Sequence, residues 1–597
     1  MFVKVFKGDI MKQYDFQQYN IFPSFRKHQE ETIKQIVDFC HSSPKRFLFV
    51  QAPTGSGKSI MAYVAARYLT DYAKHVMNCL DEYNHSNIVK DAYLLTSKNL
   101  LLDQYFRDFN RHMPICKGRS HYLCNLDHKP CNEASCLKSK RPSLMPCYST
   151  CLYQLAKRRM MSANVSATNF AYLLKIMRTD AFIRKDLCIV DECQAIESVL
   201  RDEFVVQMTE STLQVINDLK ENMRKEVKSD ILSICMQSLK KYKYNFKKID
   251  ITKIDYNNIN EVNEFVENVA KDIGSLYLSL SNALDRYTSE FCGGDEVEAL
   301  QNKEYKEMIK KCDFLKHLLS TIKDYIRLRN SVEWVVQDHK TARGAITGFE
   351  LKPVTIELLT TDLFNKIAKN KVVMMSATIG DPERFAKSLG IPFDEVEFID
   401  VPATFPVENR PFVMWPICSM SYKNMDENMP KIAEACDAIL DMYPDQKGII
   451  HSVSFKNAIY LRDHMQNSKR VLIHDQVSKN HVLEQFIKSK NSVLISPSLI
   501  EGFDFKGDLS EFQIFIKVPY MSLADKVVAR RLQLDEEWYI NNAVLQILQG
   551  VGRSVRSETD VAATFCLDNN INFLLSKYKH LFTKDFLSTV VSVSDYA

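Results

Sequence analysis

The chain has few of the residues that mark flexible or fibrous segments. Its 597 residues include only 16 glycines and 18 prolines, a composition that argues against long disordered linkers. No apolar run reaches membrane-spanning length, and the charged start of the chain, residues 1–9, does not fit a secretory signal. The net charge is only +4, so the chain as a whole is not a general polyanion binder.

The length and the cysteine content indicate the number of domains and the compartment. A chain of 597 residues is too long for one core, so three or four domains are expected. Without a secretory signal the chain should fold in a reducing compartment, where its 16 cysteines indicate metal ligation or free thiols more than disulfides. We expect a cytoplasmic protein, or one in the host cytoplasm if it is viral.

Short apolar runs alternate with amphipathic segments in two regions of the chain. This alternation predicts an α/β fold with two parallel sheets, each covered by helices. Residues 205–345 break the pattern, because their apolar residues recur at spacings of three and four, which predicts an inserted helical domain. The predicted strands are residues 46–53, 91–97, 187–192 and 371–378 in the first sheet, and 448–453, 492–497 and 513–519 in the second.

A glycine-rich loop follows the first predicted strand. The sequence Ala52-Pro-Thr-Gly-Ser-Gly-Lys-Ser59 fits a phosphate-binding loop, in which glycines let backbone N–H groups approach the β-phosphate. Lys58 is expected to reach the β- and γ-phosphate oxygens, and the Ser59 hydroxyl to bind Mg²⁺. Ala52 replaces the first glycine of the strict pattern. The candidate nucleotide contacts of the loop are Thr54, Gly55, Ser56, Gly57, Lys58 and Ser59.

An acidic pair ends another predicted strand. Asp191 and Glu192 follow the apolar run Leu187–Val190, so they should lie at the same sheet edge as the phosphate loop. There Asp191 would hold Mg²⁺, and Glu192 would orient and deprotonate the attacking water. The alternative is an acidic pair that only caps a helix. Together with the phosphate loop, the pair predicts ATP hydrolysis.

Polar residues recur at helical spacing near the C-terminus. Gln549, Arg553 and Arg556 lie in the sequence Gln546–Arg556, where the two arginines are three residues apart and share one helix face. This spacing suits arginine fingers that stabilise the γ-phosphate from a second domain. The alternative is a pair of solvent-exposed arginines without a catalytic role.

Five cysteines lie in a basic stretch between the phosphate loop and the acidic pair. Residues 116–159 carry nine Lys or Arg against Asp127 and Glu133, so positive charge is concentrated around the cysteines. This charge suits contacts with phosphates, although a solvated loop would also carry it. Spaced thiols suit tetrahedral Zn²⁺ or an iron–sulfur cluster. The five are Cys124, Cys131, Cys136, Cys147 and Cys151, with Cys116 just before them.

Taken in order, the motifs resemble the iron–sulfur helicases of superfamily 2, the XPD/DinG family, over nearly the whole chain. Residues 117–124 are close to the family's lead-in to its cluster, with His121 where the family has asparagine. The acidic pair departs from the usual Asp-Glu-Ala-His at Cys193 and Gln194. Other similar motifs are residues 25–29, where Arg26 and Gln29 would contact adenine, residues 94–98, 376–378 and 448–454, and residues 501–504, where Asp504 would contact the nucleotide.

The resemblance implies a [4Fe–4S] cluster held by four thiolates, while zinc stays the chemical alternative. Cys124 matches the family's first ligand and Cys151 its last. Cys131 and Cys136 are the predicted middle pair, and Cys147 competes for a place in it. The cysteines expected to remain free thiols are Cys116 and Cys188.

The resemblance also implies a motor that moves 5′→3′ on single-stranded DNA and separates duplexes, using ATP and Mg²⁺ between two domains. The predicted partners are single-stranded and forked duplex DNA, together with replication or repair proteins. A monomer away from membranes is expected. Tyr122, Tyr148 and Tyr153 are candidate stacking partners for bases. Two alternatives remain: a translocase without strand separation, and an ATP-gated, redox-sensing DNA-binding module.

The motifs and the resemblance together predict the domain boundaries. A nuclease domain, present in some relatives of the family, is not expected, because the first motor motif begins at residue 25. The predicted segments are a first RecA-like motor domain in three parts (1–115, 161–204 and 346–400), an iron–sulfur module (116–160), a helical arch (205–345) and a second RecA-like motor domain (401–597).

Overall fold

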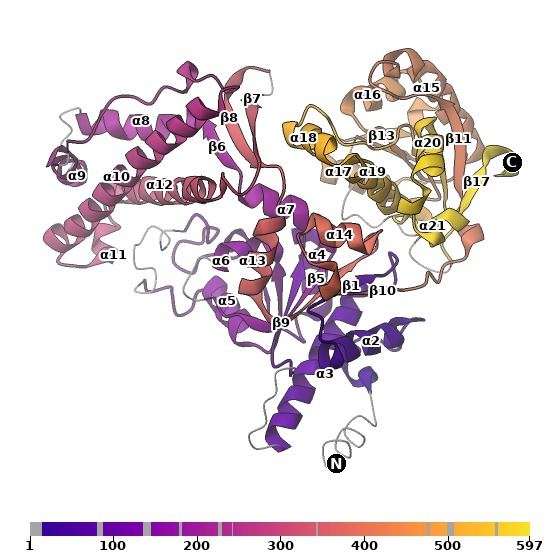
Figure 1. Ribbon diagram of the computed structural model, residues 1–597, viewed down its shortest axis with the longest axis horizontal. Helices are drawn as coiled ribbons and strands as arrows, with labels where there is room; N and C mark the ends of the chain where they lie inside the picture. The colour runs from indigo at the N-terminus through magenta and orange to yellow at the C-terminus, as the bar shows by residue number, and fades with distance from the viewer. Residues whose placement is uncertain are drawn as a thin grey trace.

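Two sheet domains and one helical insertion make up the computed structural model (Figure 1). The described residues include no helix with both the length and the apolar composition needed to cross a membrane. The structure describes residues 15–79, 88–134, 136, 145–177, 182–224, 230–241, 243–341, 344–474, 478–497, 505, 507–555 and 559–596.

The first sheet is parallel, and its order is β10-β1-β9-β5-β2-β4-β3. The strands β1, β2, β4 and β5 are buried at every residue, because helices cover both faces. The carboxyl ends of β1, β9 and β5 are neighbours, which brings the phosphate loop, Ser376 and the acidic pair to one edge. The strands are β1 Phe47–Gln51, β2 Ala92–Thr96, β3 Ile115–Cys116, β4 Val165–Asn169, β5 Lys185–Asp191, β9 Ala368–Ser376 and β10 Val396–Asp400.

The helices of the first motor domain follow or precede these strands. The helix that begins at Lys58 leaves the phosphate loop directly, and the one that begins at Asn99 follows β2 after two residues. Both lie against the sheet in Figure 1. The helices are α2 Gln29–Ser42, α3 Lys58–Cys79, α4 Asn99–Phe109, α5 Leu152–Ser162, α6 Phe170–Met177, α7 Ile196–Glu203, α13 Glu357–Ile367 and α14 Pro382–Ser388.

The second sheet is also parallel, with the order β13-β14-β12-β15-β16-β11-β17. Two parallel-sheet motor domains were predicted, and this prediction is confirmed. The strands are β11 Phe412–Cys418, β12 Gly448–His451, β13 Val471–Ile473, β14 Val493–Ser496, β15 Phe512–Phe515, β16 Ala563–Asp568 and β17 Val590–Ser592. The helices are α15 Met425–Met442, α16 Phe455–His464, α17 Lys479–Lys488, α18 Lys526–Leu534, α19 Glu536–Val551, α20 Asn570–Lys577, α21 Lys584–Ser588 and α22 Val593–Tyr596.

The inserted segment is helical but carries a small antiparallel sheet that the sequence did not predict. Strands β6 Val206–Thr209, β8 Ile346–Pro353 and β7 Trp334–Lys340 pair in that order. We expected the first motor domain to resume at residue 346, but β8 belongs to this small sheet, and the motor sheet resumes only at β9. The helices of the arch are α8 Glu210–Arg224, α9 Asp230–Lys241, α10 Ile259–Phe291, α11 Glu296–Ala299 and α12 Lys303–Leu328.

The two motor domains touch through ion pairs that lie beside the nucleotide edge. Arg384 of α14 pairs with Asp535 at 3.3 Å, and Arg531 of α18 lies 3.5 Å from Glu197 of α7. Arg531 also stacks on the ring of Trp538, with its guanidinium carbon 4.5 Å from the ring centroid. These contacts hold the carboxyl edge of the first sheet against the second domain.

Candidate active site and cysteine module

The phosphate loop is held by Arg26, which lies just before α2, and by Gln29, the first residue of that helix. Gly55 and Gly57 have φ values of 80° and 83°, in the left-handed region that favours glycine. Arg26 Nη1 donates to Gly55 O, and Gln29 Nε2 donates to Ser56 O at 2.7 Å. A Cβ on Gly57 would collide with the Gln29 amide. The two residues predicted to contact adenine therefore also shape the phosphate loop.

The acidic pair meets the start of α3 at the carboxyl end of β5. Ser59 Oγ donates to Asp191 Oδ2 at 3.1 Å, and Lys58 Nζ lies 3.5 Å from Glu192 Oε1. Burial and the neighbouring Glu192 raise the pKa of Asp191 to about 6, against the opposing effect of Lys58. A buried carboxylate beside a hydroxyl and an ammonium group suits a nucleotide-bound divalent cation, so Ser59 and Asp191 fit Mg²⁺.

A chain of side chains joins the acidic pair to the second motor domain. Gln194 Nε2 donates to Glu192 Oε2 at 2.7 Å, and Gln194 Oε1 accepts from Ser376 Oγ at 2.6 Å. Two residues after Ser376, Thr378 Oγ1 accepts from Gln549 Nε2 of α19 at 3.3 Å. Gln194, which departs from the family's usual histidine, thus links the acidic pair to Ser376. The predicted Gln549 lies at the domain interface.

Gly552 brings the second motor domain against the phosphate loop. A Cβ at this position would lie 2.7 Å from Thr54 Oγ1 and 3.1 Å from Thr54 Cγ2. Arg553 follows directly and is 8% exposed. This placement suits an arginine that reaches the nucleotide across the domain interface. The other two predicted residues on this side, Asp504 and Arg556, lie outside the described residues.

A buried histidine stands behind Arg553. His451, at the end of β12, donates from Nε2 to Gln513 Oε1 at 3.1 Å, and Gln513 Nε2 donates to Val551 O at 3.4 Å. Val551 is the last residue of α19, two residues before Arg553. Burial, and to a lesser extent the charge of Arg553, lowers the pKa of His451 to about 4. His451 is therefore neutral at physiological pH. It lies within the motif of residues 448–454, but no sequence pattern singled it out as a site residue.

The depressed pKa of His451 predicts an acid-dependent loss of stability. Above pH 6.5 His451 is neutral whether the chain is folded or unfolded; below it only the unfolded chain gains the proton, until the pH reaches about 4. At pH 5.5 the native state should lose about 1.4 kcal/mol, or about 4 °C in Tm for a domain of this size. Thermal melts at pH 7.5 and 5.5 check this.

The matched comparison replaces the histidine and a surface counterpart. His451→Gln should remove about 4 °C from the pH-dependent change in Tm, whereas His481→Gln, at an exposed position on α17, should leave the change as in the native chain. If Tm fell by the same amount between pH 7.5 and pH 5.5 in the native chain and in His451→Gln, His451 would not be the source of the acid-dependent loss of stability.

The cysteines of residues 116–159 converge into one buried group. The Sγ atoms of Cys124, Cys136 and Cys147 all lie within 4.8 Å of one another. Cys131 and Cys151 form a second contact beside them, and burial, reinforced by Cys151, raises the pKa of Cys131 to about 12. All five side chains are buried, and all are free thiols. The structure thus brings together the four predicted ligands and their competitor, Cys147.

These five thiols fit a metal centre on chemical grounds. Ligation requires thiolates, and a bound cation would stabilise the thiolate form of these buried, crowded cysteines and release their protons to water. A concentration of sulfur donors without carboxylate partners is the donor set of iron–sulfur and structural zinc sites. Cys151 is also the N-cap of α5, so a ligand there would be joined to the first motor domain.

The tyrosines around the cysteines face inward more than expected. Tyr153 is only 3% exposed, and its hydroxyl lies 2.8 Å from that of Tyr172. Its ring cannot stack on a base in this arrangement, so the expectation for Tyr153 is wrong. Tyr122 and Tyr148 are half-buried. The Tyr148 ring lies 5.9 Å from the guanidinium of Arg158, which keeps it next to positive charge.

Tyr105 is a site residue that the sequence did not reveal. Its hydroxyl donates to Asp191 Oδ2 at 3.0 Å, and its side chain is 1% exposed. Burial raises its pKa well above the usual value, so the group remains a donor. In the sequence, Tyr105 shares the apolar periodicity of Leu102 and Phe109, and nothing distinguishes it from a core residue.

Comparison with protein families finds two matching models, which fall on different parts of the chain. Residues 448–588 match the helicase C-terminal domain. Residues 22–272 match a family described as the type III restriction enzyme, res subunit. The two matches fall on the second motor domain and on the segment that contains the phosphate loop, the cysteines and the acidic pair.

The chain also resembles individual DNA enzymes at low identity. The chain is 21% identical to the 3'-5' exonuclease DinG of Staphylococcus epidermidis over 94% of this chain and 69% of that protein. It is 26% identical to the ATP-dependent DNA helicase YoaA of Haemophilus influenzae over 40% of this chain and 39% of that protein.

Solved structures share the fold. An XPD helicase structure superimposes with a TM-score of 0.58 at 15% identity, covering 96% of this chain and all (100%) of that one. Xpd4 of S. tokodaii gives a TM-score of 0.54 at 14% identity, covering 95% and 100%. The chain therefore shares the overall fold of these two structures.

Proposed function

Because the chain belongs to the XPD/DinG family of superfamily 2 helicases, which hydrolyse ATP, we propose that it unwinds duplex DNA while moving 5′→3′ along one strand. The observation that carries the proposal is the continuous site that joins the two motor domains. It includes Lys58, Asp191 and Glu192 on one side, and Gln549 and Arg553 on the other.

Residues of both motor domains would take part in ATP hydrolysis. Lys58 would neutralise charge on the β- and γ-phosphates, Ser59 and Asp191 would hold Mg²⁺, and Glu192 would orient the attacking water. Arg553 would add positive charge as the γ-phosphoryl group leaves. Because Gln549 and Gly552 contact the first domain directly, loss of the γ-phosphate would loosen the interface and move the domains along the strand.

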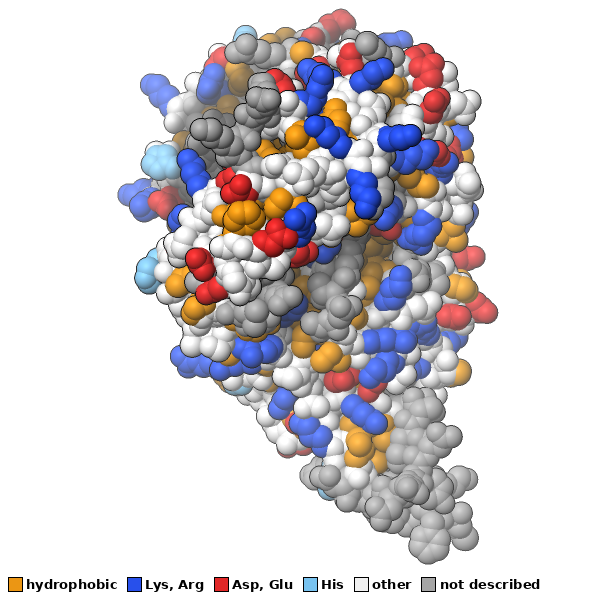
Figure 2. All heavy atoms as spheres, turned by 90° about the vertical axis from the view of Figure 1, so that its left-hand side faces the viewer, with side chains coloured by type: hydrophobic (Ala, Val, Ile, Leu, Met, Phe, Trp, Pro, Cys, Tyr) orange, Lys and Arg blue, Asp and Glu red, His pale blue; other side chains and the backbone are white. Residues whose placement is uncertain are grey.

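The cysteine module and the arch would guide and divide the DNA. We propose a [4Fe–4S] cluster ligated by Cys124, Cys131, Cys136 and Cys151, with Cys147 as the competing ligand. The cluster would fix a segment that has few regular elements of its own. Figure 2 shows many Lys and Arg side chains spread over the face that the arch presents, which suits contact with phosphates.

The compartment and assembly follow from the same account. The described cysteines are all free thiols, which suits the reducing cytoplasm. We propose a cytoplasmic monomer that acts on single-stranded and forked duplex DNA, alongside replication or repair proteins.

Stimulation of ATP hydrolysis by nucleic acid tests the proposal. The rate of ATP hydrolysis is measured with Mg²⁺ alone and after addition of single-stranded DNA, blunt duplex DNA or single-stranded RNA. We expect single-stranded DNA to give the largest stimulation. Equal rates with and without every nucleic acid would overturn the motor assignment and favour a slow, ATP-gated binding module.

The close approach of Gly552 to Thr54 predicts a steric block at the domain interface. In Gly552→Ala the new Cβ would lie 2.7 Å from Thr54 Oγ1, and a β-branched side chain in the phosphate loop has little room to turn away. We expect kcat for ATP hydrolysis to fall by about 10- to 100-fold, because the cleft no longer closes.

A second substitution separates steric block from misfolding. Thr54→Ala removes the two closest atoms that the new Cβ would meet and leaves only Leu548 O, at 3.4 Å, so the double variant Gly552→Ala/Thr54→Ala should recover activity to the level of Thr54→Ala alone. Additive losses in the double variant would show that Gly552 acts by some other route.

A further inference from the structure

We propose that Tyr105 is a positioning residue that couples the strand-binding side of α4 to the Mg²⁺-holding pair Ser59 and Asp191. This inference rests on the proposed function, since it assigns the route by which a bound DNA strand would influence ATP hydrolysis. It differs from the link through Gln194 and Ser376, which leads from Glu192 to the end of β9 and does not involve α4.

The same carboxylate oxygen of Asp191 accepts hydrogen bonds from the hydroxyl groups of Ser59 and Tyr105. Ser59 Oγ donates to Asp191 Oδ2 at 3.1 Å, and Tyr105 OH donates to the same atom at 3.0 Å. Asp191 Oδ1 accepts from the backbone N–H of Glu192 at 3.0 Å. A carboxylate with this full set of donors has a fixed orientation, and the Tyr105 hydroxyl is the only one of the three that comes from α4.

The start of α4 lies where the DNA strand is expected. Lys98 is the exposed residue that precedes the helix, at the end of the motif expected to touch DNA. Tyr105 follows seven residues later, about 10 Å along the same helix. Because a two-turn helix transmits a displacement with little bending, a shift of its first residues moves the Tyr105 hydroxyl relative to Asp191.

The same helix end is joined to the cysteine module. Asn99, the first residue of α4, accepts a hydrogen bond at Oδ1 from Asn169 Nδ2. Asn169 Oδ1 accepts from the backbone N–H of Tyr172 at 2.6 Å, and the Tyr172 hydroxyl contacts that of Tyr153 at 2.8 Å. Tyr153 lies two residues after Cys151. The start of α4 is thus linked, through Asn169, Tyr172 and Tyr153, to the cysteine module.

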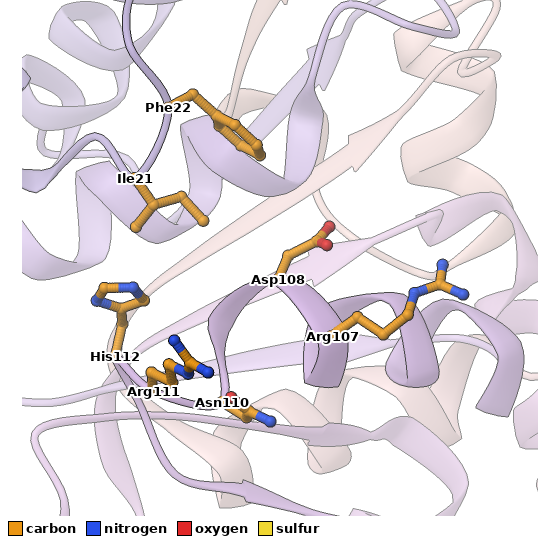
Figure 3. Close-up of a pocket in the computed structure, with 7 residues that line it drawn as sticks. All are labelled: Ile21, Phe22, Arg107, Asp108, Asn110, Arg111 and His112. Atoms are coloured by element: carbon orange, nitrogen blue, oxygen red, sulfur yellow. The ribbon is translucent and has the colours of Figure 1, made fainter.

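The far end of α4 leaves space for a small movement. Phe109 packs on Tyr63 of α3, with ring centroids 5.0 Å apart. On the other side, the end of the helix opens onto a cavity of about 380 Å³, seen in Figure 3 between Arg107 and Asp108 of α4 and the segment of Ile21 and Phe22. The helix is therefore packed on one side and unobstructed on the other.

The test compares Tyr105→Phe with Tyr93→Phe in the full chain. Each removes one buried hydroxyl, but Tyr93 donates to Ile183 O at 2.7 Å and has no contact with the site. The ratio of ATPase rates with and without an oligothymidine strand is measured, and binding of a fluorescent ADP analogue is titrated with and without Mg²⁺ and the strand. We expect Tyr105→Phe to lower the stimulation ratio about tenfold and weaken Mg²⁺-dependent ADP binding, with Tyr93→Phe unaffected.

A double variant tests the route. Asn99→Ala removes the tie to Asn169, so it should lower the stimulation ratio too, and Tyr105→Phe should then add little further loss. The inference would be overturned if Tyr105→Phe had the same stimulation ratio as the native chain. This includes the case in which its basal and its DNA-stimulated ATPase rates fall by the same factor. If the native chain itself shows no stimulation, the proposed function fails, and the inference with it; a native chain that is stimulated while Tyr105→Phe matches it overturns the inference alone.

Discussion

Replacing Arg553 with alanine is expected to lower kcat for ATP hydrolysis by about 10³-fold or more, with little change in the affinity for ATP. The guanidinium group follows Gly552, which touches the phosphate loop, and it is held in a buried position. Charge that develops on the transferring phosphoryl group is greatest in the transition state, so its loss should affect kcat more than KM. Steady-state kinetics with saturating single-stranded DNA gives both constants.

The control for Arg553 is an arginine of the same domain that lies far from the nucleotide. Arg462 on α16 is exposed and pairs with Asp463 at 2.7 Å, so Arg462→Ala should hydrolyse ATP at the native rate. Arg553→Lys keeps the charge but not the forked geometry and should recover only part of the rate. If kcat of Arg553→Ala stayed within about tenfold of the native value, Arg553 would not be a catalytic residue, because an arginine finger contributes a much larger factor to kcat.

Single serine substitutions of the cysteines are expected to divide into two classes. Cys124→Ser, Cys131→Ser, Cys136→Ser and Cys151→Ser should each lose the bound iron, because a serine hydroxyl is a much poorer ligand for iron than a thiolate. Cys147→Ser should retain about four irons per chain. Iron and sulfide are measured after anaerobic purification, together with the absorbance spectrum near about 400 nm.

The same series decides between the open alternatives. Loss of iron in Cys147→Ser with retention in Cys131→Ser would move Cys147 into the ligand set, in agreement with its closeness to Cys124 and Cys136. A colourless native protein that holds stoichiometric zinc would contradict the iron–sulfur assignment. Cys188→Ser is the matched control, since this buried thiol lies inside β5 and should leave the metal content unchanged.

The parallel sheets and their motifs were accessible from the sequence because their signals are local. The run Phe47–Val50 is apolar at every position, as a strand buried on both faces must be, and the glycines after it permit the positive φ values that the loop adopts. The convergence of Asp191 on Ser59 then follows from the fact that parallel strands end at one edge. Here local patterns and topology lead to the same site.

The small sheet of the arch was missed because it is assembled from distant pieces. β6 and β8 are separated by more than a hundred residues, and only their pairing makes them a sheet. Their burial pattern is mixed, so neither strand has the strong period of a core strand. For this reason the sequence prediction placed β8, which begins at residue 346, in the first motor domain.

Tyr105 and His451 were missed for a different reason. Both are buried polar residues. Tyr105 shares the apolar periodicity of α4, and His451 lies in the motif of residues 448–454, where no pattern separates its role from that of its neighbours. Their significance depends on one partner each, Asp191 and Gln513, which lie far away in sequence. Only the three-dimensional arrangement shows that such a side chain faces the site.

Strand displacement from a forked DNA substrate tests the central claim most directly. Forks with a labelled strand and a single 5′ or 3′ overhang are incubated with the protein, ATP and Mg²⁺, alongside Arg553→Ala. The account predicts release of the labelled strand from the 5′-overhang substrate only, and none with the variant. Strong DNA-stimulated hydrolysis without release from either substrate would contradict it and assign the chain as a translocase that does not separate strands.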